Sequence, residues 1–237
     1  LLEKAKQADI DCEIEDERQQ GRNINVDFIG ELRSEQDKAL KELIKYDNGI
    51  LHAATAFGKT VVSSAIIAQK KVSTLIILES SALIEQWKEA LGKFLNINEE
   101  LPTYETKTGR VRKRKSLIGT LQGAHDSMTG IIDIAMAGSL CKKGEYHKLL
   151  KEYGLVLVDE CHHSASETIA NVLKEVKAKY VYGVTATPKR GDGLEKINYM
   201  LIGSIRYSYT AKEKAKEQGI QHLVYPRFTR TVPPRPS

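Results

Sequence analysis

The 237-residue sequence has few cysteines, no long apolar run and no internal repeat, and each absence excludes a class of protein. Its three cysteines, Cys12, Cys141 and Cys161, form no CxxC pair, so neither a disulfide framework nor a thiolate zinc site is predicted. A reducing, cytoplasmic compartment is therefore expected. The longest apolar runs, such as residues 73–78, are far shorter than the roughly 20 residues of a membrane-spanning helix. The first residues carry no signal-peptide pattern, so no membrane association is predicted.

The composition is that of an ordinary globular protein, with 41% hydrophobic and 28% charged residues. The length suits one large domain with flanking pieces, because single cores rarely grow beyond roughly 250 to 300 residues. The net charge of +5 and the pI near 8.9 suit a phosphate-rich partner. Many proteins without such a partner are equally basic, so the charge alone decides nothing.

Short β-type runs alternate with amphipathic helical stretches, which is the pattern of a mostly parallel sheet with helices on both faces. The fold class is therefore predicted to be α/β. The expected strands are nearly all apolar, which indicates burial on both faces; they are residues 49–53, 73–78, 131–135, 155–158 and 180–184. The expected helices are residues 35–46, 60–70, 82–94, 145–153, 164–178 and 193–201.

The chain divides into three parts by composition. Residues 1–28 suggest a charged helix, an alternating strand and a polar linker, and are interpreted as the end of a preceding module. Residues 29–203 hold the alternating strands and helices. Residues 204–237 contain a strand over 205–210, a Lys/Glu-rich helix over 211–218 and a proline-rich end, and are interpreted as a connector. Because the sequence opens without Met, we expect it to be a piece of a longer chain.

The sequence AATAFGKT, residues 53–60, has the strand, loop and helix context that a phosphate-binding loop requires. Backbone N–H groups in such a loop, together with the helix N-terminus, cradle phosphate oxygens. Lys59 would place its charge on the β and γ phosphates of ATP, and the Thr60 hydroxyl would ligate Mg²⁺. The expected nucleotide-binding residues are Thr55, Ala56, Phe57, Gly58, Lys59 and Thr60.

Two alanines depart from the full GxxxxGK[ST] pattern. Ala53 occupies the position of its first glycine, and Ala56 also stands where glycine is usual. We expect Ala56 to avoid a positive φ, which alanine adopts only at a cost. By itself, a Gly-Lys-Thr tripeptide is also compatible with a plain strand-to-helix turn capped by the threonine.

The sequence LVLVDECHH, residues 155–163, is a buried strand that ends in two carboxylates. At that sheet edge Asp159 can hold Mg²⁺, and Glu160 can orient and deprotonate an attacking water. Lys59, Asp159 and Glu160 are the predicted catalytic residues, because phosphoryl transfer depends mainly on positioning and electrostatic stabilisation. A helix-capping Asp-Glu pair is the plainer alternative.

Hydrogen-bonding residues follow the carboxylates. Three adjacent residues, 161–163, cannot easily all face one metal ion, so His162 is predicted to hydrogen-bond between motifs instead. The sequence GVTATPKR, residues 183–190, follows another buried strand. Its hydroxyl residues Thr185 and Thr187 fit a hydrogen-bond relay to the carboxylates, although a TAT tripeptide alone is an ordinary capping pattern.

Taken together, AFGKT, DECHH and TATPKR resemble motifs I, II and III of superfamily 2 helicases of the DExH type. The resemblance covers roughly residues 32–207. The phrase GVTATPKRGDGL is similar to that of restriction-enzyme helicase subunits and excision-repair helicases of the transcription factor IIH kind. The resemblance implies a RecA-like P-loop NTPase lobe that uses ATP and Mg²⁺, contacts DNA and requires a second RecA-like lobe.

The resemblance also implies further site residues. LRSEQ, residues 32–36, resembles the Q-type motif, which implies that Gln36, helped by Arg33, reads the adenine. Residues 79–87 resemble motif Ia, with Ser80 as a phosphate contact despite Glu79 beside it. Residues 136–140 resemble motif Ib or Ic, with Ser139 as the contact. Trp87 is expected in the core, because it falls on an apolar helical face.

A basic segment, residues 107–115, is predicted to form a β-hairpin between motifs Ia and Ib, on the nucleic-acid side. Arg112, Lys113 and Arg114 would act there as a sequence-independent phosphate clamp. A solvated hairpin tip explains the same residues, and both interpretations stay open.

The predicted function is the ATP-binding motor lobe of an ATP-dependent DNA helicase or translocase. Two alternatives remain: an RNA helicase lobe, since such a lobe reads the backbone, and a non-catalytic interaction module that keeps the helicase shape. A metabolic P-loop kinase fits DECHH followed by TATP badly. Because the second lobe supplies an arginine finger worth about 10³ to 10⁵ in rate, we expect the lobe alone to bind Mg-ATP weakly and to hydrolyse it near background.

Overall fold

The main element is an eight-stranded sheet. The structure, a computed structural model, describes residues 7, 15–106, 108–164, 166–187, 195–210 and 212–213. The strands of the sheet are β2 (Asn48–Ala53), β3 (Thr74–Leu78), β7 (Ile118–Gln122), β8 (His125–Asp126), β9 (Ile132–Met136), β12 (Leu155–Asp159), β13 (Tyr180–Thr185) and β14 (Ile205–Tyr209). Their order is β14-β2-β13-β12-β3-β9-β7-β8, and only the β7–β8 pair is antiparallel. The mostly parallel sheet predicted from the sequence is confirmed.

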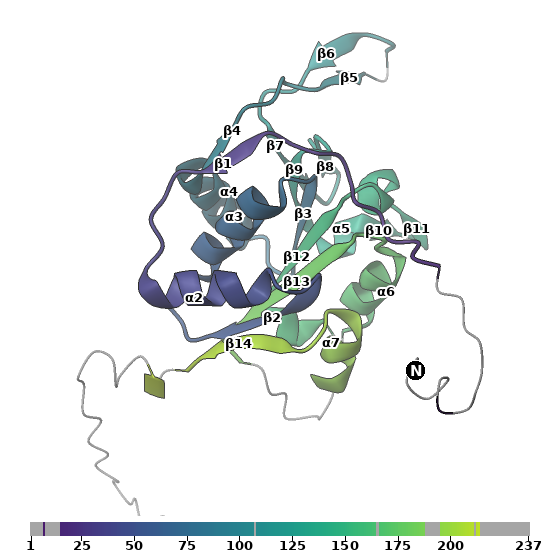
Figure 1. Cartoon of the computed structure of the whole chain (residues 1–237). Helices are drawn as coiled ribbons and strands as arrows, with labels where there is room; N and C mark the ends of the chain where they lie inside the picture. Colours follow the sequence, from purple (N-terminus) through teal and green to yellow (C-terminus); the bar gives the residue numbers. More distant parts are fainter. Residues whose placement is uncertain are drawn as a thin grey trace, which may run out of the picture.

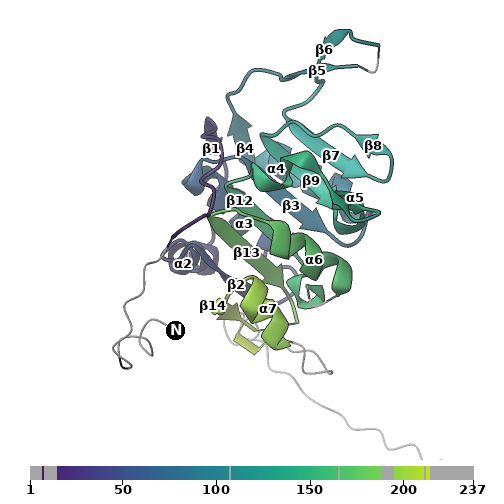
Figure 2. The ribbon, with the colours of Figure 1, turned by 90° about the vertical axis from the view of Figure 1, so that its right-hand side faces the viewer.

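Helices cover both faces of this sheet (Figures 1 and 2). One face carries α2 (Ser34–Leu43), α3 (Lys59–Lys70) and α4 (Leu83–Phe94), and the other carries α5 (Ala137–Leu140), α6 (Glu167–Glu175) and α7 (Glu195–Leu201). Successive strand residues point to opposite faces, so Leu157 joins the core under α2 to α4, whereas Val156 and Val158 join the core under α5 to α7. This explains why the central strands are apolar along their whole length. Among the described residues, no helix is both long and apolar enough to cross a bilayer.

The predicted basic hairpin is present and consists of β5 (Thr103–Glu105) and β6 (Val111–Lys113). Strand register shows where it is rooted. Ile118, the first residue of β7, pairs with Ile132, which pairs with Thr74, the first residue of β3. The hairpin therefore projects from the amino ends of the parallel strands (Figure 1). Lys107, which the prediction included, lies outside the described residues.

Two other small sheets complete the described fold. Strand β1 (Val26–Phe28) pairs antiparallel with β4 (Leu95–Ile97), and β10 (Cys141–Lys142) pairs with β11 (Glu145–Tyr146). The helix predicted over residues 145–153 is wrong, because that stretch forms β11 and a 3₁₀ turn, η1 (Lys148–Lys151). The turn before it contains Lys143 and Gly144 at positive φ, which closes the β10–β11 hairpin instead of starting a helix.

Both predicted domain boundaries need correction. Ile24 and Val26 are buried in the main core, so the domain begins before residue 29. Strand β14 pairs with β2 in the main sheet, so the boundary after residue 203 falls inside the domain. The charged helix and the alternating strand predicted within residues 1–28 lie largely outside the described residues, as do the helix over 211–218 and the proline-rich end.

Candidate active site

The loop between β2 and α3 has the backbone of an anion-binding turn. Gly58 has a φ of 88° and Ala56 a φ of 64°, so the expectation that Ala56 avoids positive φ is wrong. Backbone turns that use left-handed residues form concave N–H nests that bind anions. A Cβ at Gly58 would lie 2.4 Å from Nε2 at the end of the Gln36 side chain, so a larger residue would displace Gln36 and would also have to adopt the positive φ.

The loop is held in place from α2 and β14. The Phe57 side chain is buried, and its ring centroid lies 5.0 Å from that of Tyr209. Its carbonyl accepts hydrogen bonds from Nε2 of Gln36, at 2.7 Å, and from the guanidinium of Arg33. Oε1 of Gln36 in turn accepts from the Arg33 N–H at 2.9 Å. Arg33 and Gln36 therefore lie beside the phosphate loop, where they fix its shape, and their contact with adenine stays a prediction.

Lys59 and Glu160 meet across the site. Lys59 is the first residue of α3, and its Nζ lies 3.5 Å from Oε1 of Glu160 at the end of β12. Thr60 follows Lys59 in the first turn of the helix. Strand β13 separates β2 from β12 in the sheet, so both loops emerge at the same carboxyl edge. The fold thus brings together residues that are about a hundred positions apart in the sequence.

Asp159 is held by two donors and is largely buried. Its Oδ2 accepts from Nε1 of Trp87 at 2.8 Å, and its Oδ1 accepts from the N–H of Glu160 at 2.9 Å. Burial raises the pKa of Asp159, and this effect exceeds the lowering by the Trp87 hydrogen bond. Trp87 is 1% exposed, so its predicted core position is confirmed, but its polar bond to Asp159 was not predicted.

These residues fit a Mg²⁺-bound nucleotide. Asp159 and Thr60 offer the hard oxygen ligands that Mg²⁺ prefers. Burial opposes ionisation of Asp159, and a divalent cation would supply the positive charge that stabilises the carboxylate. Lys59 would meet the phosphate charge, and the loop from Thr55 to Gly58 would surround it.

A hydrogen-bonded chain links the carboxylate motif to the end of β13. Nδ1 of His162 lies 2.9 Å from Oγ1 of Thr185 and 3.3 Å from Oε2 of Glu160. The Thr187 N–H donates to Oγ1 of Thr185 at 3.1 Å. The predicted relay residues are therefore brought together. The sequence did not indicate Asn198 of α7, whose Nδ2 donates to the His162 carbonyl at 3.3 Å. This bond connects α7 to the carboxylate motif.

The candidate nucleic-acid contacts fall into two separate groups. Ser80 follows β3 at the carboxyl edge and is exposed. Ser139 is near that edge but is buried, and its Oγ accepts from the Gly123 N–H at 2.8 Å, so it supports the β7–β8 turn. Its contact with a phosphate stays a prediction. Arg112 and Lys113 lie in the hairpin at the amino ends, away from the edge that carries Lys59.

Known proteins are similar to this chain in sequence and in fold. A family model described as "Type III restriction enzyme, res subunit" matches residues 29–190. The DNA 3'-5' translocase XPB2 of Sulfurisphaera tokodaii is 32% identical over 185 residues, which are 78% of this chain and 37% of that protein. The chain thus spans well under half the length of this relative.

Two solved structures have the same fold. The Sulfolobus solfataricus SWI2/SNF2 ATPase core in complex with dsDNA has a TM-score of 0.54 at 20% identity, covering 85% of this chain and 42% of that one. The UvsW helicase from bacteriophage T4 has a TM-score of 0.57 at 11% identity, covering 86% and 75%. The chain therefore belongs to the family of type III restriction enzyme res subunits and has the fold of the N-terminal RecA-like lobe of superfamily 2 helicases.

Proposed function

We propose that this chain is the ATP-binding motor lobe of an ATP-dependent DNA helicase or translocase that works with a second RecA-like lobe. The observation that carries the proposal is the meeting of Lys59 with Glu160, beside Asp159, at one sheet edge. Family membership implies the use of ATP, and the relative from S. tokodaii is named a DNA 3'-5' translocase. The structure of the SWI2/SNF2 core contains dsDNA, which favours DNA as the partner.

Each residue has a role that follows from its position. Asp159 and Thr60 would hold Mg²⁺, which neutralises phosphate charge when it is bound. Lys59 leaves its contact with Glu160 to meet the β and γ phosphates, because a phosphate carries more charge than one carboxylate. Glu160 is then free to orient and deprotonate the attacking water. His162 and Thr185 connect Glu160 to the end of β13 and so to the segment that follows.

The second lobe is part of the proposal because the chain spans 37% of its relative from S. tokodaii and resembles one of the two RecA-like lobes of such motors. An arginine finger from such a lobe contributes about 10³ to 10⁵ in rate. The lobe alone should therefore bind the nucleotide but hydrolyse it near background. Cys141 and Cys161 carry free thiols, which is consistent with the cytoplasmic location that we propose.

The test is titration of the chain with a fluorescent ATP analogue in Mg²⁺. Wild type is compared with Lys59→Ala and with a matched control, Lys45→Ala, which removes an exposed lysine of the turn that follows α2. We expect saturable binding that Lys59→Ala abolishes and Lys45→Ala leaves unchanged. Absence of wild-type binding at millimolar analogue would contradict the proposal and favour a non-catalytic interaction module.

The choice between DNA and RNA has its own measurement. A labelled DNA duplex bound to the chain is competed with unlabelled DNA and RNA duplexes of the same sequence. DNA should compete at least as well as RNA. A clear preference for RNA would identify a 2′-hydroxyl contact and favour an RNA helicase lobe.

A further inference from the structure

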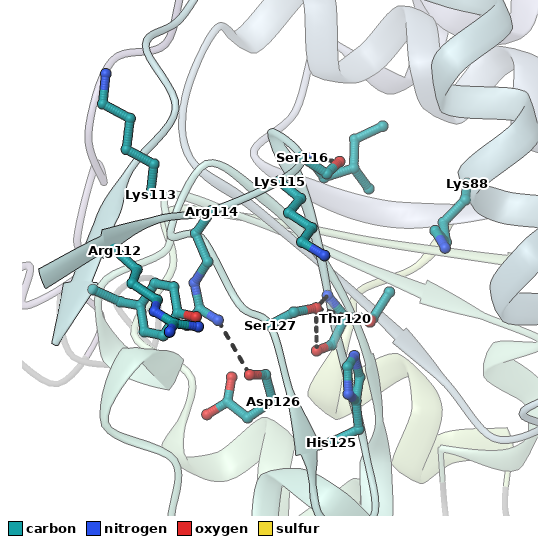
Figure 3. A pocket seen from close by; sticks show the side chains of 12 residues that line it. Lys88, Arg112, Lys113, Arg114, Lys115, Ser116, Thr120, His125, Asp126 and Ser127 are labelled. Atoms are coloured by element: carbon teal, nitrogen blue, oxygen red, sulfur yellow. Dashed lines mark hydrogen bonds between the residues drawn. The ribbon is translucent and has the colours of Figure 1, made fainter. Parts of the chain in front are cut away.

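A basic cavity lies along the β8 edge of the sheet, outside the nucleotide site. Its volume is about 500 Å³, and three separate parts of the chain line it: α4, the stretch from β5 to β7, and β8 (Figure 3). The basic side chains that line it are Lys88, Arg112, Lys113, Arg114, Lys115 and His125. Asp126 is the one acidic residue among the lining residues. The cavity therefore has a large excess of positive charge.

Most of this charge is not neutralised by the protein. Among the ion pairs of the described residues, none involves Arg112, Lys113 or Lys115. Asp126 is engaged by His147, whose Nε2 lies 3.1 Å from Oδ2. Lys88 has Glu85 as a partner at 3.0 Å on the exposed surface of α4. A polyanion in the cavity would thus meet Arg112 and Lys115 without a competing carboxylate, whereas the Lys113 side chain points away from these two (Figure 3).

One arginine fixes the shape of the cavity. NH1 of Arg114 donates to the Asp126 backbone carbonyl at 3.2 Å (Figure 3), and its guanidinium lies 4.4 Å from the centroid of the Tyr104 ring. These contacts connect the β5–β6 hairpin to β8. The base of the hairpin is therefore bonded to strand β8 of the sheet. A hairpin that is only a solvated surface loop would not need this bond.

The cavity continues toward the carboxyl edge of the sheet. From the hairpin base it follows β7 and β8 as far as His125, next to the β7–β8 turn. The same turn is bonded to Ser139 through the Gly123 N–H. The basic surface thus runs from the amino ends of the strands to the neighbourhood of Ser139, the nucleic-acid contact predicted from the resemblance to motif Ib or Ic.

We propose that this cavity is a second binding site for nucleic-acid backbone phosphates, additional to the contacts at the carboxyl edge. The proposal rests on the proposed motor function for the presence of a nucleic acid. Arginine and lysine side chains recognise phosphates without reading sequence, and the hydroxyls of Ser116, Thr120 and Ser127 line the same cavity as further polar groups. The site adds affinity and registers the duplex on the lobe, and it takes no part in ATP binding.

The test is the salt dependence of duplex binding. The chain with Arg112→Ala, Lys113→Ala and Lys115→Ala together is compared with wild type by anisotropy of a labelled duplex over a salt series. Arg114 is left intact because it joins the hairpin to β8. Each lost phosphate contact should lower the slope of log K against log salt by about 0.9. We expect the slope to fall by roughly two to three units and the affinity at low salt to drop at least tenfold.

A matched control removes three positive charges elsewhere, through Lys41→Ala on α2, Lys45→Ala in the turn after it and Lys174→Ala on α6. This control should leave the slope within about one half unit of wild type. An unchanged slope in the cavity variant, or an equal change in the control, would overturn the proposal. So would wild type that fails to bind duplex at low salt, or an acidic peptide that competes as well as duplex.

Nucleotide binding separates this proposal from the motor function. The cavity variant should bind the fluorescent ATP analogue as wild type does, and Lys59→Ala should retain the full salt slope. If the slope falls but no variant or wild type binds nucleotide, the cavity proposal stands and the motor proposal fails. If wild type binds nucleotide but the cavity variant keeps the wild-type salt slope, the motor proposal stands and the cavity proposal fails.

Discussion

The indole Nε1 of Trp87 donates a hydrogen bond to Oδ2 of Asp159 at 2.8 Å, which joins helix α4 to the end of strand β12. Ser80, the predicted nucleic-acid contact, precedes α4 by only three residues. If nucleic acid binds at Ser80 and shifts α4, the shift would reach the proposed Mg²⁺ ligand through the Trp87 side chain. Trp87 is thus a positioning residue for Asp159.

Replacing Trp87 with Phe keeps a buried aromatic ring and removes the donor. Because Asp159 then loses one of two hydrogen bonds in a buried setting, we expect the Mg²⁺-dependent part of the nucleotide affinity to weaken about three- to tenfold. The measurement is the ratio of dissociation constants for the fluorescent analogue in Mg²⁺ and in EDTA. Glu89→Ala, on the exposed face of α4, is the control. An unchanged ratio in Trp87→Phe would show that the hydrogen bond does not position Asp159.

Trp87 is also the only tryptophan of the chain. Its fluorescence should respond when Mg²⁺ and a non-fluorescent nucleotide bind, because its indole touches Asp159 directly. We expect a saturable change in emission with Mg²⁺ and nucleotide together that is absent in Lys59→Ala. A change of the same size with Mg²⁺ in Lys59→Ala would mean that the signal does not report nucleotide binding.

We expect Glu160 to oppose nucleotide binding even though it favours the proposed hydrolysis. Its carboxylate lies 3.5 Å from Nζ of Lys59, so it competes with the phosphates for that charge. Glu160→Gln should therefore bind the ATP analogue roughly two- to fivefold more tightly, since one partly exposed negative charge is worth about 0.5 to 1 kcal/mol here. Lys59→Ala should move the affinity in the opposite direction. Weaker binding by Glu160→Gln would show that Glu160 supports the bound nucleotide instead.

The phosphate loop contains an alanine in the left-handed region. Ala56 has a φ of 64°, which costs an L-residue about 1 to 2 kcal/mol, whereas glycine adopts it freely. Ala56→Gly should therefore raise the free energy of unfolding by about 0.5 to 1 kcal/mol, measured by urea denaturation. Ala53→Gly is the matched control. Ala53 is a fully buried strand residue without a positive φ, so its replacement should lower the free energy of unfolding by a similar amount.

The strands of the central sheet could be predicted because burial on both faces leaves an unbroken apolar run. The expected strand at residues 155–158 is observed as Leu155–Asp159, and that at 180–184 as Tyr180–Thr185. The meeting of Lys59 with Glu160 followed from the rule that carboxyl ends of parallel strands share one edge. Strand β7 was missed because its sequence, Ile118–Gln122, includes glycine, threonine and glutamine, which make it resemble a loop.

Other features depend on tertiary contacts that sequence patterns do not contain. The positive φ of Ala56 occurs in a loop that Arg33 and Gln36 hold by bonds to the Phe57 carbonyl, 21 to 24 residues away. The bond from Trp87 to Asp159 joins positions 72 residues apart. The place of the basic hairpin follows from the register of β7, the strand that the pattern did not show. Local periodicity predicts helices and strands. The contacts between distant residues form only when those helices and strands pack against one another.

Asp133 is a buried carboxylate at the start of β9 that serves the fold rather than the nucleotide site. It is fully buried and accepts from the Tyr153 hydroxyl at 2.6 Å and from the N–H groups of Thr129 and Gly130 at 2.8 and 2.6 Å. Burial raises its pKa in spite of these donors. Tyr153→Phe should lower the free energy of unfolding by about 1 to 3 kcal/mol, because a buried acceptor loses a partner.

The pH dependence of this loss has a definite sign. A carboxyl group with a raised pKa in the folded state stabilises the fold at low pH and loses that contribution as pH rises through the folded pKa. Tyr153→Phe should raise the pKa of Asp133 further, so the loss of stability should be larger at neutral pH than near the ordinary carboxyl pKa of 3.8. The control is Tyr182→Phe. Tyr182 is equally buried, but its hydroxyl donates to the backbone carbonyl of Tyr46. A backbone carbonyl does not titrate, unlike the Asp133 carboxylate. Its substitution should cost about 1 kcal/mol at both pH values. An equal pH dependence in the two variants would show that Asp133 does not titrate in this range.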